Sequence, residues 1–189
     1  TLTMTQYLKI KKIIIIIMTP FLSFSQDDNH YKVVKKIENI EIREYDALLF
    51  ASYNNSDLKN RSSSFRPLAD YIFGSNERNE EIGMTSPVVI KLYNNNEMLF
   101  KMPEKYNKQN IPNPKNENIK IIETNSTQKA VIQYSGYSNT EKEKEKTEEL
   151  IRILAKYNIK HTSEFELFVY DSPYKFFNRR NEISVNILQ

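Results

Sequence analysis

Apolar and polar residues alternate through the first structured stretch of the chain. Ile37, Ile40 and Ile42 stand among lysine, glutamate and arginine, and the apolar run 47–51 follows directly. Alternation of this kind is typical of strands that bury one face. We therefore predict an extended pair of segments that is interrupted near Asp46.

The spacing of apolar residues then changes from two to three or four. Three serines at 62–64 precede this segment, and Gly74 follows it. Serine hydroxyls cap helix N-termini and glycine ends helices, so the pattern predicts an amphipathic helix that stops at Gly74. The apolar positions on its predicted face are Phe65, Leu68, Ala69, Ile72 and Phe73.

A hairpin and a long loop are predicted next. Two apolar segments, 88–93 and 98–102, flank the three asparagines at 94–96, which favour a tight turn. The stretch 103–118 is rich in proline and asparagine and predicts a surface loop.

The second half repeats this order of elements. Strands are expected at 119–123 and 129–134, and a helix is expected to open on a capping box formed by Thr140 and Glu143. Its predicted buried residues are Leu150, Ile151 and Leu154, whereas the charge run 141–149 is interpreted as a solvated face. Strands at 165–170 and 183–188 close the chain.

Together these elements predict an α+β fold made of two βαββ units. The prediction rests on the order of the elements and not on sequence identity between the halves. Two such units are expected to form a curved or barrel-like antiparallel sheet with two main helices.

The first 25 residues have the order of a secretory signal peptide. Lys9, Lys11 and Lys12 precede an apolar run at 13–24, and small residues stand before a predicted cut ahead of Gln26. An uncleaved anchor is the alternative, although this run of about 12 residues is shorter than the roughly 20 that span a bilayer. We expect export to a periplasm or out of the cell, no stable membrane insertion after cleavage, and one domain at 26–189.

Composition excludes several classes of site. The 189 residues contain no cysteine, three glycines and two histidines, so disulfide scaffolds, thiol nucleophiles, phosphate-binding glycine loops and histidine-rich metal sites are not expected. The net charge of +3 comes from the three lysines before residue 26. Because the remainder is neutral, nucleic acid is not an expected partner.

Five short motifs are spread over the chain in a fixed order. They are E-I-R-E-Y at 41–45, Y-I-F-G-S-N-E at 71–77, I-G-M-T-S-P-V at 82–88, F-K-M-P at 100–103 with Tyr106, and Tyr174 with R-R-N-E-I at 179–183. In this order and spacing they resemble the SOUL haem-binding family and cover nearly the whole predicted domain.

The resemblance implies a fold similar to gyrase-inhibitor-like ligand-binding domains. It also implies that haem or another tetrapyrrole binds non-covalently in an apolar crevice beside the first helix. The expected cofactor-binding residues are Phe65, Leu68, Ala69, Tyr71, Ile72, Met84 and Arg179. The alternative is that the helical stripe is ordinary core; Tyr71 and Arg66 lie off the stripe and are the candidates for the rim.

The resemblance leaves the iron without a clear histidine ligand. Glu44 stands where His-ligated members carry the axial histidine. His161 is expected in a surface loop, and His30 is expected to be disordered near the cleavage site. Tyrosine is another possible class of axial ligand, represented here by Tyr45 and Tyr71. No metal-ligating residue is therefore assigned.

Two interpretations of the C-terminal motif stay open. Arg179 and Arg180 either clamp ligand carboxylates or join the last strand to its neighbours beside Glu182.

The predicted function is an exported binding protein for haem or a related planar ligand. The alternatives are a small-molecule hydrolase that uses Glu44, Tyr45 or Glu182 as acid–base groups, and an interaction module without a ligand.

Overall fold

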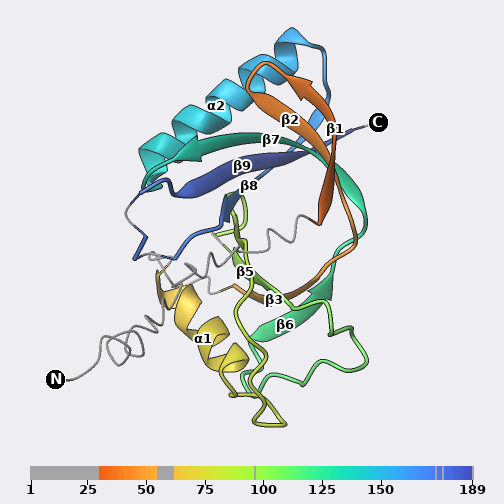
Figure 1. Cartoon of the computed structure of the whole chain (residues 1–189), viewed down its shortest axis with the longest axis vertical. Helices are drawn as coiled ribbons and strands as arrows, with labels where there is room; N and C mark the ends of the chain where they lie inside the picture. Colours follow the sequence, from red (N-terminus) through yellow and green to blue (C-terminus); the bar gives the residue numbers. More distant parts are fainter. Residues whose placement is uncertain (1–29, 55–61, 96, 173, 176, 189) are drawn as a thin grey trace, which may run out of the picture.

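The computed structural model describes residues 30–54, 62–95, 97–172, 174–175 and 177–188, and the predicted leader at 1–25 lies outside them. In this part, the strands form one nine-stranded antiparallel sheet that curls strongly (Figure 1). The strands are β1 (Tyr31–Ile37), β2 (Ile40–Tyr45), β3 (Leu49–Tyr53), β4 (Val88–Lys91), β5 (Glu97–Lys101), β6 (Ile119–Glu123), β7 (Thr127–Ser135), β8 (His161–Val169) and β9 (Arg180–Ile187). The helices are α1 (Ser62–Ile72) and α2 (Thr140–Lys156).

The strand order confirms the predicted duplication. The order across the sheet is β1-β2-β7-β9-β8-β4-β5-β3-β6. In each unit the strand before the helix pairs with the last strand of that unit, which gives β7-β9-β8 in one half and β4-β5-β3 in the other. The two units meet where β4 pairs with β8. The fold is therefore α+β with two βαββ units, as the order of elements predicts.

The helices and the sheet enclose one large core. Helix α1 contacts β3 and β5, and α2 contacts β7, β8 and β9. Alternate residues of a strand point to opposite faces. Met98 and Phe100 accordingly belong to the core beneath the helices, while Leu99 belongs to a second apolar cluster on the other face. No described helix is long and apolar enough to cross a membrane.

Helix α1 begins at the predicted serines but buries a different stripe. Leu68, Tyr71 and Ile72 are buried, whereas Phe65 and Phe73 are exposed. The helix ends at Ile72, so Phe73 lies in the turn that leads to Gly74, where helical spacing no longer holds. The predicted position of Phe73 on the buried face is therefore wrong, and Tyr71 takes that place.

The cap of helix α2 also differs from the prediction. Asn139, rather than Thr140, is the N-cap, and its side chain accepts a hydrogen bond from the Lys142 amide at 2.8 Å. Glu143 turns into the structure and accepts a hydrogen bond from the Ser138 hydroxyl at 2.8 Å. Further along the helix, Leu150 and Leu154 are buried as predicted, but the prediction for Ile151 is wrong, because Ile151 is exposed and Ile153 is buried in its place.

His161 lies in a strand and not in the predicted surface loop. It opens β8 and pairs with Ile187 of β9, and its side chain is half-buried. Pairing with β9 extends β8 toward its N-terminus beyond the apolar residues that mark it in the sequence.

Candidate ligand-binding cavity

The sheet face opposite the helices curls around a cavity of about 580 Å³. Ligand pockets in proteins generally measure about 300–1,000 Å³. Strands of both halves contribute to its wall, from β1 and β2 at one end of the sheet to β6 at the other. Its apolar lining includes Tyr45, Phe50, Val89, Leu99 and Phe168.

The register of the strands places these apolar residues in a row. Leu99 of β5 is opposite Val89 of β4, which is opposite Phe168 of β8. Phe168 is in turn opposite Glu182 of β9. Because directly opposed residues in a sheet point to the same face, the row runs across four strands from an apolar surface to a buried carboxylate.

Glu182 is fully buried at the centre of an ionic network. Two nitrogens of the Arg43 guanidinium donate to its carboxylate at 2.8 and 3.1 Å, and Arg180 Nε donates at 3.0 Å. The hydroxyl of Tyr170 donates to it at 2.9 Å. Glu41 accepts from Arg43 Nε at 2.8 Å, so two guanidiniums face two carboxylates. Glu41 also pairs with Lys36 at 2.9 Å, and the network meets the cavity lining through Tyr170.

Tyrosines extend this network toward the cavity. Arg43 donates to the Tyr45 hydroxyl at 3.3 Å, and Arg180 donates to that of Tyr31 at 2.9 Å. Burial raises the pKa of Tyr45 and of Tyr170, and for both the nearby charge of Glu182 raises the pKa further. These phenols therefore remain protonated and offer the cavity neutral polar groups.

Basic side chains line a second part of the cavity. Lys91, Lys101 and Lys129 contribute to the lining. Lys129 pairs with Glu166 at 2.6 Å and Lys91 pairs with Glu97 at 3.0 Å. The cavity therefore combines an apolar row with ammonium groups close to its wall.

His30 lies in the wall of the cavity, immediately before β1. Its carbonyl accepts a hydrogen bond from the Asp46 amide at 3.2 Å, and its Nδ1 lies 3.3 Å from an Oε1 of Glu104. Its Nε2 is buried and has no hydrogen-bond partner among the described residues. The prediction that His30 is disordered is wrong, because the pairing of β1 with β2 and the bond to Asp46 hold the residue in place.

None of the seven residues predicted to bind the cofactor lines this cavity. Leu68, Tyr71 and Ile72 are buried in the core between helix and sheet, where the helix uses its apolar face for packing. Ala69 is half-buried, and Phe65 and Met84 are 41% and 46% exposed. Leu68 and Ile72 of the predicted stripe therefore pack in the core, and so does Tyr71, which lies off that stripe.

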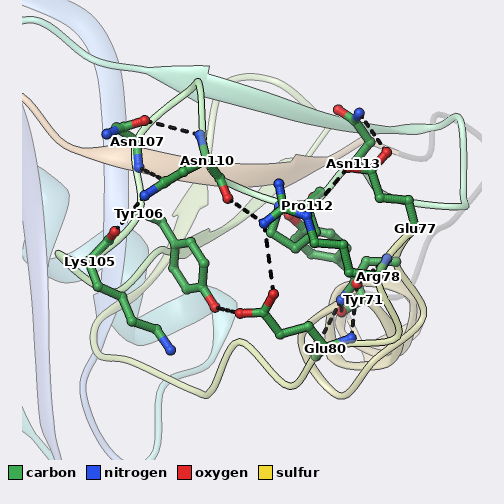
Figure 2. Close-up of polar contacts among 11 residues, drawn as sticks. Tyr71, Glu77, Arg78, Glu80, Lys105, Tyr106, Asn107, Asn110, Pro112 and Asn113 are labelled. Carbon is green, nitrogen blue, oxygen red and sulfur yellow. Dashed lines mark hydrogen bonds and ion pairs between the residues drawn. The ribbon is translucent and has the colours of Figure 1, made fainter.

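Tyr71, which the sequence predicts at the rim of the ligand site, links the loop 103–118 to helix α1. Its hydroxyl donates to the carbonyl of Pro112 at 2.8 Å (Figure 2). Around it, the Tyr106 hydroxyl donates to Glu80 at 2.5 Å, and Asn113 donates to Glu77 at 3.0 Å. These contacts fix the loop 103–118 over the end of the helix, so Tyr71 has a structural position and not one at a rim.

The two arginines of the C-terminal motif have separate partners. Arg179 Nη1 donates to the carbonyls of Ser172 and Lys175 at 2.9 and 3.3 Å, and its guanidinium lies over the Tyr137 ring. Arg180 bonds Glu182, as described above. Both arginines are therefore engaged within the protein, which agrees with the interpretation that the motif joins the last strand to its neighbours.

Of the three acid–base groups suggested for a hydrolase, only Tyr45 lines the cavity. Glu44 is exposed and does not line the cavity. Tyr45 lines the cavity and Glu182 does not, and both are held in the ionic network. The cavity residues Val89, Leu99 and Phe168 are predicted by the sequence only as parts of strands.

Comparison with known proteins adds a family and a fold. The model of the family described as SOUL heme-binding protein matches residues 26–186. Heme-binding protein 1 of Xenopus tropicalis is 30% identical over 173 residues, covering 83% of this chain and 90% of that protein, and its Xenopus laevis counterpart is 29% identical over the same length.

Solved structures share the fold at low identity. The EcmrR C-terminal domain matches with a TM-score of 0.60 and 11% identity, covering 84% of this chain and 98% of that one. A hydrolase from Listeria innocua matches with a TM-score of 0.56 and 6% identity, covering 82% and 94%. At such identities the likeness concerns the fold alone.

Proposed function

This chain belongs to the SOUL haem-binding family, and from this membership we propose that it reversibly binds haem or a related tetrapyrrole in the cavity on the uncovered face of the sheet. The observation that carries the proposal is a cavity of about 580 Å³ with an apolar row across its wall. The relatives named above carry the name heme-binding protein 1, which supports a ligand of this class for the cavity.

The residues of the cavity fit the chemistry of the ligand. A porphyrin is a flat apolar ring with two carboxylates, so it requires apolar walls and cations near its edge. Val89, Leu99 and Phe168 supply an apolar surface, and Lys91 and Lys129 supply ammonium groups. The buried Nε2 of His30, which lacks a partner among the described residues, is a nitrogen of the kind that haem iron binds.

A haemin titration of the full chain tests the proposal. We expect a saturable shift of the haem absorption band. Ile122→Trp fills the cavity from the edge strand β6, where Ile122 is half-buried and lines the cavity. It is expected to weaken binding at least about tenfold, or about 1.4 kcal/mol.

Phe65→Glu is the matched control, because Phe65 is exposed on helix α1 and does not line the cavity. It is expected to leave the titration unchanged, and the circular dichroism of both variants checks that they fold. If Phe65→Glu abolishes binding while Ile122→Trp does not, the ligand lies beside helix α1, as the sequence predicted. If the unmodified chain gives no saturable shift, the binding proposal fails and an interaction module is favoured.

We also propose that the protein is exported and that residues 1–25 are removed. The basic, apolar and small-residue order of this segment supports cleavage before Gln26. The family match, which begins at residue 26, agrees with a domain that starts at this position.

The mass of the exported protein tests this proposal. Expression of the full chain in a secreting host is expected to release a species that begins at Gln26. Ser25→Arg places a large residue directly before the cut and is expected to retain the leader. Recovery of the unmodified chain with residues 1–25 attached would contradict cleavage.

A hydrolase function is not proposed. In the described part of the chain, Glu182 accepts hydrogen bonds from two guanidiniums and a phenol, so its lone pairs are committed to the protein. A general base needs a carboxylate that reaches the substrate.

A further inference from the structure

We infer that His30 provides an axial ligand to the haem iron through Nε2 and that Glu104 orients its imidazole. This inference rests on the proposed haem binding and assigns a residue that the opening-strand motif does not contain.

The contacts of the ring define which nitrogen is free to act as a ligand. Nδ1 of His30 lies 3.3 Å from the carboxylate of Glu104, whose side chain is 76% exposed, while Nε2 is buried without a partner among the described residues. In a neutral imidazole whose Nδ1–H donates to a carboxylate, the lone pair is on Nε2. Metal-ligating histidines commonly use this arrangement, in which a carboxylate fixes the tautomer and makes the ring a stronger donor.

The unpaired nitrogen itself points to a ligand. Buried polar groups in proteins almost always have hydrogen-bond partners, and those without one require a reason. His30 is also held by its backbone, through the bond from Asp46 and the start of β1 directly after it. Because Nε2 is buried, ligation requires the imidazole to turn toward the cavity that His30 lines.

Other side chains are less suited to this role. The hydroxyls of Tyr45 and Tyr170 lie in the Glu182 network, and their raised pKa values disfavour the phenolate that would bind iron. The Tyr71 hydroxyl donates to the Pro112 carbonyl, and Tyr71 lies in the core between helix α1 and the sheet, away from the cavity. His161 does not line the cavity, and its Nδ1 lies 2.5 Å from the Thr162 carbonyl oxygen.

Spectroscopy of the haem complex tests the assignment of His30. The full chain with ferrous haem is expected to show an iron–imidazole stretching band in resonance Raman spectra. His30→Ala is expected to lose this band while still binding haemin, and added imidazole is expected to restore it. His161→Ala is the matched control, since it removes the only other histidine of the sequence, and should keep the band.

The outcomes separate this inference from the function on which it rests. If the chain binds haemin saturably but His30→Ala gives the same spectrum as the unmodified chain, the inference is overturned and the binding proposal stands. If the unmodified chain binds no haemin, both fail.

A second variant tests Glu104 as a positioning residue. Glu104→Gln removes the anionic partner of Nδ1, so the imidazole becomes a weaker donor and stabilises ferric iron less. We expect a more positive reduction potential of the bound haem and an affinity lower by about tenfold. Glu81→Gln makes the same change at an exposed carboxylate that does not line the cavity, and it should change neither quantity. An unchanged potential in Glu104→Gln would overturn this role.

Discussion

Replacing Glu182 by glutamine is expected to lower the free energy of unfolding by about 3–5 kcal/mol, the usual cost of breaking a buried ion pair from one side. The substitution keeps the shape of the side chain but removes its charge. Arg43 and Arg180 then lose the carboxylate that each contacts, and Arg43 is 2% exposed, so water does not replace it. Chemical denaturation of the variant and of the unmodified chain measures this loss.

Glu44→Gln is the matched control for the same change of chemistry. Glu44 is exposed on β2, so we expect its effect to stay within about 0.5 kcal/mol. A loss below about 1 kcal/mol in Glu182→Gln would show that the two guanidiniums find compensation without the carboxylate. It would contradict the conclusion that Glu182 is the central partner of both arginines.

This network illustrates what the sequence predicts and what it leaves out. The motif at 179–183 shows that Arg180 and Glu182 are close along a strand, and their contact follows from that spacing. The bond between Glu182 and Arg43 joins residues 139 positions apart. It exists because β7 lies between β2 and β9 in the sheet, and a strand order of this kind is a property of the whole fold.

The position of the cavity also depends on tertiary structure. The pattern of the first helix identifies an apolar stripe, but it does not state what the stripe packs against. Once α1 covers one face of β3 and β5, the opposite face is left to line a cavity. The sequence of β5 does indicate that both of its faces are buried. Its apolar run 98–100 is continuous, and continuous apolar runs are typical of strands buried on both faces.

The sequence does not predict the ordered position of His30 in the cavity wall, for a different reason. Its closeness to the predicted cleavage site suggested disorder, as is usual near chain ends. Tyr31 nevertheless begins a strand that pairs along the length of β2, and this pairing orders the residue before it. The contact with Glu104 comes from a loop more than 70 positions away, and no spacing in the sequence indicates it.

Replacing Leu68 by alanine is expected to lower the free energy of unfolding by about 2–5 kcal/mol, as large-to-small changes in cores do. Leu68 is fully buried in the core that α1 shares with the sheet. The truncation removes apolar contacts and leaves space that the helix cannot fill, since α1 is fixed at its far end by Tyr71 and Pro112. Denaturation measures the loss of stability, and a haemin titration under conditions where the variant is folded is expected to give an unchanged affinity.

Phe65→Ala is the contrasting change on the same helix. Phe65 is 41% exposed and meets Phe100 edge-on with ring centres 5.2 Å apart, so its truncation is expected to cost only about 0.5–1.5 kcal/mol. The pair of variants separates packing from binding, because Leu68 and Phe65 were both expected to contact the ligand. If Leu68→Ala keeps its stability and loses haemin binding, the face of helix α1 is a slot for the ligand and not part of the core. If it loses stability alone, the helix supports the sheet, and binding belongs to the cavity on the other face.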